Sequence, residues 1–538
     1  MRLFQLPVLL IAGVVLVPVL AVFGSLAQWN THSADILHAM ASTVLPRYAM
    51  TTVMLCAGVA AGVAIAGCAT AFAVTLFDFY GRKTLEWALL LPLAMPAYVV
   101  AYAYTDFLQY SGPAQDSIRA LTGLNGRVLP EIRSVGGAVA VFVFTLYPYV
   151  YLLARTALLE RAGHLMECAR MLGSPLPRRM RSVALPLVRP AVAAGVALAL
   201  METLADFGVS SYFGIQTFTV GIYKAWLSMD DRIAAAQLSC MLLVVVGALL
   251  ALERRVQRYR RFVTPKGSGA GAVAARLALT GRSRILAQLT CALPVLAGFL
   301  LPVLFMLRPV WQHLRYGDIH LPWSAFFLWT WHSVKLGLIA AALAVGAALL
   351  LSFAARYAPG RLIRLVLGLA GLGYAVPGAV IVVGILLPVG WLQATQPGWG
   401  VGYVFTATTL GVLWAYLVRF CAVALQSVQS GYSRIPPSYD ETARTLGVSG
   451  VGLLLRVHWP LLSRSLLVAA LLVFVDVMKE LPATLVLRPF NHDTLAVVAY
   501  QLARDERLGE AALPCLLLVA VGLLPVVVIS RAMNRGAR

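Results

Sequence analysis

Long runs of apolar, uncharged residues are the feature that most limits what this sequence can fold into. The chain has 538 residues, of which 60% are hydrophobic and 12% are charged. A soluble globular protein has about a quarter charged residues. Runs of roughly 20 uncharged residues fit helices that cross a bilayer, because inside lipid every backbone polar group needs an internal partner. The sequence therefore predicts an all-α polytopic membrane protein.

About twelve such runs fall into two groups of six. The first run follows Arg2 and raises the alternative of a signal peptide, but its length and the parity of the later spans favour an uncleaved first helix. The predicted spans are 6–28, 50–77, 84–108, 134–158, 190–212, 233–252, 285–307, 331–355, 362–388, 404–427, 463–486 and 509–530.

The two groups repeat one plan. Residues 1–253 form the first transmembrane half, 254–284 a basic linker with a Gly/Ser/Ala-rich centre, and 285–538 the second half. Within the third span of each half, Ala94-Met95-Pro96 is matched by Ala375-Val376-Pro377. Six spans per half give both halves the same orientation, so we predict two parallel six-helix repeats.

The formal net charge of +21 does not by itself indicate nucleic acid. Lys and Arg concentrate in alternate connections, as the positive-inside rule expects, although Arg119, Arg127 and Arg133 fall in outer connections. This bias predicts a multi-pass membrane protein with both termini in the cytoplasm, whose surroundings are the lipid bilayer and not nucleic acid. The seven cysteines are scattered and form no metal-binding spacing, so no metal site is assigned.

One polar motif occurs twice between spans. The copies are ECARMLGSPLPRRMRSVALP (167–186) and ETARTLGVSGVGLLLRVHWP (441–460), inside connections that we bound at 160–190 and 429–463. Both have an acid, then Ala at the second following position, Gly at the sixth, Val at the sixteenth and Pro at the nineteenth. The candidate docking residues are Glu167, Ala169, Gly173, Pro186, Glu441, Ala443, Gly447 and Pro460.

These residue types predict a short helix, a turn and a second helix that enters the membrane. Ser438 is a plausible helix cap, and Asp440 and Glu441 suit the first turn of a helix. Gly173 and Gly447 permit a turn with positive φ, and proline is tolerated where a helix begins. An ordinary amphipathic loop is the alternative, but two copies with matched positions favour a soluble partner that docks twice.

Five charged residues lie in apolar runs that follow the two motifs: Glu202, Asp206, Asp476, Lys479 and Glu480. In each half two acids are four positions apart, which predicts that they share one helix face. Charges at such depth usually face a bundle interior or a water-filled path. We expect these residues to lie along a translocation pathway for a cationic or strongly polar substrate; a structural network in which Lys479 neutralises Asp476 is the alternative.

The repeated motif resembles the EAA loop of ABC importer permeases. Cys168 and Thr442 depart from the second-position Ala of that pattern, and Trp459 replaces Leu before Pro460. The resemblance implies the type I permease fold, and it implies that each loop is a coupling helix seated in a groove of a cytoplasmic ABC ATPase, a homodimer with one subunit per loop. It also implies a bacterial inner membrane as the location and a periplasmic substrate-binding protein as a further partner.

The segments 204–226 and 479–503 further resemble the ferric-ion permeases of iron(III) importers, which fuse two halves in one chain. That resemblance implies Fe³⁺ as the cargo. Fused thiamine permeases share the architecture and are the main alternative, because carboxylates suit a cationic organic substrate as well as a hard cation.

No phosphate-binding G-x-x-x-x-G-K-[ST] motif occurs in the chain. We therefore expect a transporter subunit and not an enzyme, with no catalytic residue and no cofactor of its own, while ATP is used by the partner subunit. A proton-coupled secondary transporter would explain Asp206 and Glu480 but not two matched docking motifs. A scaffold or channel without an energy source is a third alternative.

Overall fold

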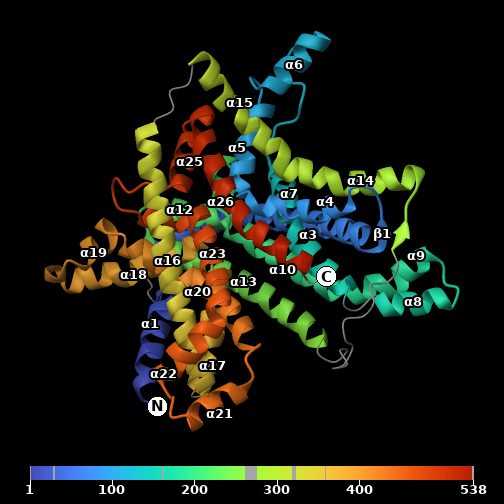
Figure 1. Cartoon of the computed structure of the whole chain (residues 1–538). Coiled ribbons are helices and arrows are strands. Elements are labelled where there is room, and N and C mark those ends of the chain that lie inside the picture. Colours follow the sequence, from blue (N-terminus) through green and yellow to red (C-terminus); the bar gives the residue numbers. More distant parts are fainter. Residues whose placement is uncertain are drawn as a thin grey trace. The chain divides into compact units, whose positions relative to one another are not determined.

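The computed structural model describes residues 2–27, 31–159, 163–260, 276–317, 323–357 and 359–535. Their regular structure is almost entirely helical (Figure 1). Among the described residues, two short strands, β1 (Phe77–Asp78) and β2 (Leu277–Ala278), pair in parallel. The first three residues of the predicted loop 160–190 and positions 261–275 of the predicted linker lie outside the described residues.

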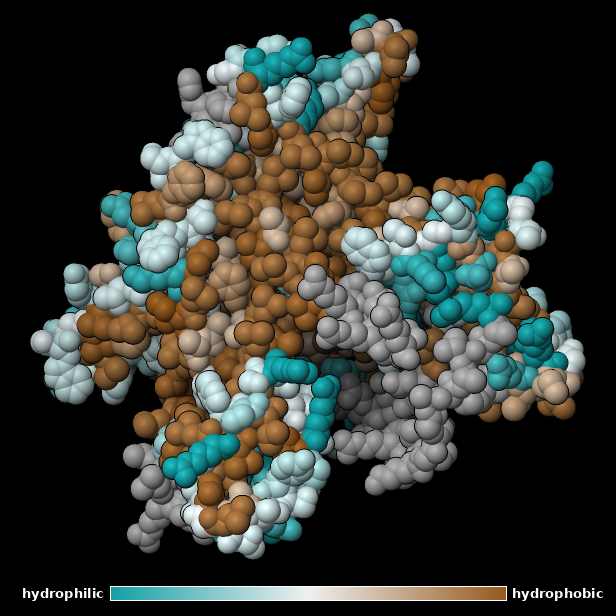
Figure 2. All heavy atoms as spheres, in the orientation of Figure 1, coloured by the Kyte–Doolittle hydropathy of each residue, from teal (hydrophilic) through white to brown (hydrophobic). Residues whose placement is uncertain are grey.

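Eleven helices in the described part of the chain are long and apolar enough to cross a membrane, or up to twelve with one bent pair. The prediction of an all-α membrane protein with about twelve spans is confirmed. Large apolar side chains such as Ile65 and Leu467 are largely exposed on these helices, as lipid-facing side chains are. Figure 2 shows such hydrophobic side chains gathered over the long helices, while hydrophilic ones gather over the connections.

The chain divides into two compact units, each built from both ends of the sequence. Unit 1 is 1–42, 221–243 and 322–501, and unit 2 is 43–220, 244–321 and 502–538. Unit 1 holds α1 (Arg2–Gly24), η1 (Ser25–Ala27), α2 (Thr31–Thr43), α16 (Trp323–Tyr357), α17 (Arg361–Ala370), η6 (Gly373–Ala375), α18 (Gly378–Thr395), η7 (Pro397–Trp399), α19 (Val401–Ala407), α20 (Leu410–Tyr432), α21 (Pro437–Thr445), α22 (Val451–Leu453), η8 (Leu454–His458), α23 (Trp459–Lys479), α24 (Pro482–Leu487) and α25 (Leu495–Arg504).

Unit 2 holds the two strands and α3 (Leu45–Leu76), α4 (Arg82–Ala88), η2 (Leu91–Ala94), α5 (Ala97–Leu108), α6 (Pro113–Thr122), α7 (Val135–Ala157), α8 (Gly163–Met171), α9 (Leu176–Arg179), η4 (Met180–Ala184), α10 (Leu185–Ala205), α11 (Gly208–Tyr212), α14 (Gly281–Val295), η5 (Leu296–Leu300), α15 (Leu301–Tyr316) and α26 (Leu508–Arg535). The helices α12 (Phe218–Leu227) and α13 (Arg232–Arg260) contribute residues to both units, and so do α2, whose last residue Thr43 lies in unit 2, and α25, whose residues 502–504 lie in unit 2.

The two units therefore do not coincide with the predicted halves 1–253 and 285–538, which describe the repeat in the sequence. In unit 1 the first helix, α1, packs against α18 of the second half. Gly384 makes this possible, since a Cβ there would lie 2.2 Å from the carbonyl oxygen of Pro18. In unit 2, α15 and α26 pack against each other and against α5 of the first half.

The predicted third span of each half is broken at its proline. Pro96 separates η2 from α5, and the helices on either side are bent by 92°. Pro377 separates η6 from α18 in the same way. The prediction of a single helix over 84–108 and over 362–388 is therefore wrong, because proline removes a backbone donor and restricts the residue before it.

Candidate functional site

Each copy of the repeated motif begins with a short helix that ends at a glycine. The first loop (residues 167–186) starts on α8 in unit 2, and the second loop (residues 441–460) starts on α21 in unit 1. Gly173 has φ 76° and Gly447 has φ 78°, the left-handed region in which glycine carries no steric penalty. The predicted turn is confirmed at both positions.

The two helix ends carry the same hydrogen bonds. The Ser174 amide donates to the carbonyl of Ala169 at 3.0 Å, and the Val448 amide donates to the carbonyl of Ala443 at 2.9 Å. This bond spans five residues in both loops, which is the Schellman arrangement that satisfies the last carbonyls of a helix. The position two residues after the acid is thus a hydrogen-bond acceptor in both copies.

Both loops then enter the membrane through a widened helical turn. The turns η4 and η8 are π-helical, and the amides of Leu185 and Trp459 bond to the carbonyls of Met180 and Leu454. Pro186 and Pro460 come directly afterwards, in the first turn of the long helices α10 and α23. Because proline has no N–H and its ring collides with the carbonyl four residues back, a wider turn accommodates it.

The two loops share an exposed leucine that the sequence analysis did not single out. Leu172 is 87% exposed and Leu446 is 77% exposed, and each directly precedes the turn glycine. An exposed apolar side chain gains free energy when a partner covers it, because removal of apolar surface from water is favourable. The signal was present in the sequence, because Leu stands five positions after the acid in both copies, and Arg170 and Arg444 are matched as well.

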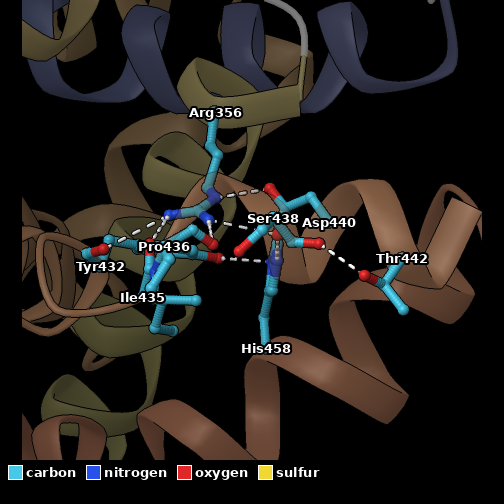
Figure 3. Close-up of polar contacts among 8 residues, drawn as sticks. All are labelled: Arg356, Tyr432, Ile435, Pro436, Ser438, Asp440, Thr442 and His458. Carbon is cyan, nitrogen blue, oxygen red and sulfur yellow. Dashed lines mark hydrogen bonds and ion pairs between the residues drawn. The ribbon is translucent and has the colours of Figure 1, made fainter.

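The second loop is held by a buried polar cluster (Figure 3). Arg356, in the last turn of α16, donates through Nε to Oδ2 of Asp440 at 2.6 Å. His458 of η8 contacts the other carboxylate oxygen at 2.9 Å, and the Tyr432 hydroxyl lies 3.2 Å from Nδ1 of the same imidazole. Burial opposes ionisation of Asp440, but the hydrogen bonds from Arg356 and His458 outweigh it and hold the pKa of this carboxyl below its ordinary value.

The first loop has no such cluster in the part that the structure describes. The same offset of 274 residues places Met166 opposite Asp440 and Ala184 opposite His458, and both are buried apolar side chains. Arg179 is buried, and its Nη1 lies 3.5 Å from the carbonyl oxygen of Met166. The first loop is therefore closed on itself mainly by packing.

The acids at the far ends of α10 and α23 lie where helices break. Glu480 is buried, follows the last residue of α23 and accepts hydrogen bonds from the amides of Ala483 (2.9 Å) and Thr484 (3.0 Å). Asp206 likewise follows α10 and accepts from the Ser210 amide at 3.1 Å. Each carboxylate thus caps the next short helix.

The prediction that the two acids of each half share one helix face is wrong. Both helices end before the second acid, and the backbones of Asp206 and Glu480 are extended. Glu202, Asp476 and Lys479 lie within the helices and are half-buried. Arg419 of α20, which the sequence analysis did not identify, lies 3.3 Å from Glu480 in a buried ion pair.

A family model for the binding-protein-dependent transport system inner membrane component matches residues 58–260 and 344–538. Each match includes one of the two loops. The chain belongs to this permease family. The predicted resemblance to ABC importer permeases with two fused halves is therefore confirmed, and such permeases are transporter subunits rather than enzymes.

Two relatives with known names resemble this permease over most of its length, and a third resembles part of it. The Fe(3+)-transport system permease protein FbpB 2 of Haemophilus influenzae is 23% identical over 89% of the chain and 88% of its own length. The probable ABC transporter permease protein y4fN of Sinorhizobium fredii is 24% identical over 90% of the chain and 87% of its own length. The sulfate permease CysT of Salmonella typhimurium is 28% identical over 37% of the chain and 71% of its own length.

The residues predicted to dock a partner divide into two kinds. Gly173, Gly447, Pro186 and Pro460 define the backbone of the loops, as described above. Glu167 is half-buried and Glu441 is exposed, and neither makes a side-chain hydrogen bond or ion pair within the described part of the chain. Both acids are therefore available for a partner.

Proposed function

We propose that this permease is the membrane-spanning subunit of an ATP-driven importer, and that a cytoplasmic ABC ATPase docks on its two loops. The observation that carries the proposal is the shared geometry of the loops. Each presents an acid (Glu167, Glu441) on a short helix and an exposed leucine (Leu172, Leu446) in the turn that follows it, shortly before a long membrane span. A homodimeric ATPase offers two equal grooves, which two loops of equal backbone geometry would fill.

In this proposal the ATPase moves the loops, and the loops move α10 and α23. The permease hydrolyses nothing itself. A helix that begins in the loop and continues through the bilayer transmits displacement along its axis, since packed helices move as rigid elements. The loops and both termini lie in the cytoplasm, and a periplasmic binding protein delivers the cargo from the other side.

The proposed cargo is Fe³⁺. Similarity to FbpB 2 over nearly the whole chain supports it, as do the acids Glu202, Asp206 and Asp476, because hard cations prefer oxygen ligands. The relatives also include permeases named for sulfate and molybdenum, and thiamine stays an alternative from the sequence. The pathway role of the acids rests on their position in α10 and α23 and at the ends of these helices.

Uptake by intact cells tests the proposal. Cells that lack the gene would receive the wild-type permease or the double variant Gly173→Val with Gly447→Val, which forces a β-branched residue into positive φ at both loop turns. Gly452→Ala is the matched control, because its Cβ would meet Val448 at an ordinary 3.5 Å. Radiolabelled Fe³⁺, sulfate, molybdate and thiamine would be supplied in parallel.

The expected result is Fe³⁺ uptake that needs ATP, is lost in the double variant and persists in Gly452→Ala. Uptake of sulfate, molybdate or thiamine in place of Fe³⁺ would overturn the cargo but keep the permease. Transport that persists in the double variant, in normally inserted protein, would overturn the role of the loops.

A further inference from the structure

Arg356 of α16 joins α20, the connection that follows it and α21 at the second loop (Figure 3). Its Nη1 donates to the carbonyl oxygens of Tyr432 (3.3 Å) and Ile435 (2.9 Å), at and just after the end of α20. Its Nη2 donates to the carbonyl of Pro436 (3.0 Å) and to Oδ1 of Asp440 (3.2 Å), and its Nε donates to Oδ2. These five bonds employ all five N–H donors of a guanidinium.

Asp440 is the carboxylate on which this cluster converges. Arg356 approaches it from α16, and His458 approaches it from η8, the turn that leads into α23. His458 is completely buried. Donation from its Nε2–H to Asp440, with Nδ1 accepting from the Tyr432 hydroxyl, satisfies all three groups at once.

A second contact joins the same two helices. The Arg444 guanidinium of α21 lies over the ring of Tyr357, the last residue of α16, at 5.3 Å from its centroid. A guanidinium within about 6 Å of a ring centroid is attracted to the ring face. The helix that would seat in the partner's groove is therefore tied at two points to the end of α16.

The first loop shows that this arrangement is not required for the shared backbone. Met166 and Ala184 occupy the positions of Asp440 and His458, and Leu158 occupies that of Tyr432. Within the described residues of α8, no side chain makes a hydrogen bond or ion pair to a preceding span. The first loop nevertheless has the same turn glycine, the same Schellman hydrogen bond and the same π-helical turn as the second.

We propose that Asp440 is a positioning residue that clamps the second loop to α16, so that displacement of α21 by the partner moves α16 and α23 together. In the described part of the first loop no such ion pair links α8 to a preceding span, so this loop would pass displacement mainly to α10. The inference rests on the proposed function, because it assumes that a partner pushes on both loops. The two loops would then differ in the helices that they move, although their backbones have the same conformation.

A merely structural role for Asp440 would change stability and nothing else. The clamp instead predicts uncoupling, in which ATP is still hydrolysed but moves less cargo. The full complex would be purified from native membranes through a tag on the permease and reconstituted in liposomes. The variants are Asp440→Asn, the conservative Asp440→Glu, and Met166→Ala as the matched change in the first loop.

The clamp predicts that Asp440→Asn retains the ATPase in the complex but raises the ATP hydrolysed per Fe³⁺ transported about fivefold or more, the lower end of typical coupling energies. Asp440→Glu restores part of the coupling, and Met166→Ala stays close to the wild-type ratio. A wild-type ratio in Asp440→Asn would overturn the inference, and so would an equal rise in Met166→Ala.

Hydrogen exchange of the purified permease tests the clamp without any transport. The amides of α21 are expected to exchange more slowly than those of α8, and Asp440→Asn or Arg356→Lys should remove this difference. Equal exchange in the two wild-type helices would overturn the clamp. If no ATPase accompanies the wild-type permease, the proposed function fails, while the exchange experiment still decides whether the clamp exists.

Discussion

The two loops share one backbone conformation but are attached to the neighbouring helices in two different ways. Gly173 and Gly447 turn the chain with nearly the same φ, and the same five-residue hydrogen bond closes each helix. Yet the second loop is fixed by an ionic cluster around Asp440, whereas the first packs through Met166. The positions that match between the two copies therefore determine the shape of the loop, and the positions that differ determine how the loop is attached.

The helix breaks beyond the loops show the same difference. Glu480 and Asp206 both cap a following short helix, but only Glu480 has an arginine partner in the described residues, Arg419. At the same offset of 274 residues, the first half has Thr145, whose hydroxyl bonds to the carbonyl of Val141 in its own helix. Twice, the second half has an ion pair where the first half has a neutral side chain.

The largest expected effect comes from breaking the more deeply buried pair. Arg419→Gln leaves the Glu480 carboxylate without its cation at a buried site, which should cost about 4 kcal/mol of stability. Thr145→Val, the matched change, should cost about 1 kcal/mol. Thermal unfolding of the purified permease measures both, and equal losses would contradict the comparison.

The next effect concerns the arginine that contacts each loop, Arg356 for the second loop and Arg179 for the first. Arg356→Gln should cost about 3 kcal/mol, because it unpairs Asp440 and three carbonyls at once. Arg179→Gln should cost about 1 kcal/mol, because Arg179 makes one long hydrogen bond in the described structure. The exposed Arg361→Gln serves as the control, and the comparison fails if Arg179→Gln is the more damaging variant.

The turn glycines should respond alike, since the loops share their backbone. Gly173→Ala and Gly447→Ala should each cost about 1–2 kcal/mol, because a Cβ is strained in the left-handed region. Hydrogen exchange of α8 and α21 would report the loosening of each helix end, with Gly452→Ala unaffected. A clear difference between the two glycines would mean that the loops differ in backbone after all.

The smallest effect is a pH dependence confined to the second loop. The pKa of Asp440 is depressed in the folded protein, so the carboxylate stabilises the fold above its unfolded value of about 4 and loses this effect as the pH falls through the lower folded value. The stability gap between wild type and Asp440→Asn should stay constant from about pH 8 to 5 and shrink below about pH 4. The exposed Asp505→Asn is the control. If the stability difference between wild type and Asp440→Asn already disappears near neutral pH, the lowered pKa of Asp440 is contradicted.

The sequence predicted what depends on local pattern. Uncharged runs predicted the spans, and Gly and Pro at matched spacing predicted the turn and the start of the next helix. The matched Pro96 and Pro377 also carried a signal for the breaks in the third spans, because proline disrupts a helix interior. The two copies of the motif also match at Leu172 and Leu446, but the exposure of these side chains is visible only in the folded loops.

What the sequence could not predict depends on contacts between distant residues. Arg356 and Asp440 are 84 positions apart, and Arg419 and Glu480 are 61 apart. No periodicity connects such pairs, because they meet only when α16, α20 and α23 pack together. The interleaved units follow the same rule, since the position of α1 beside α18 depends on a close approach at Gly384.

Cross-linking of the loop tips to the ATPase tests whether the partner docks on the two loops. Leu172→Cys and Leu446→Cys would each be introduced into a Cys168→Ser background, which removes the exposed native thiol of the first loop. Tyr403→Cys, exposed on α19 in a connection expected on the outer side, is the control. The account predicts that a short cross-linker joins both loop cysteines, and not the control, to the ATPase in the native complex. Failure of both loop cysteines to link, in a complex that still transports, would contradict the claim that these loops are where the partner docks.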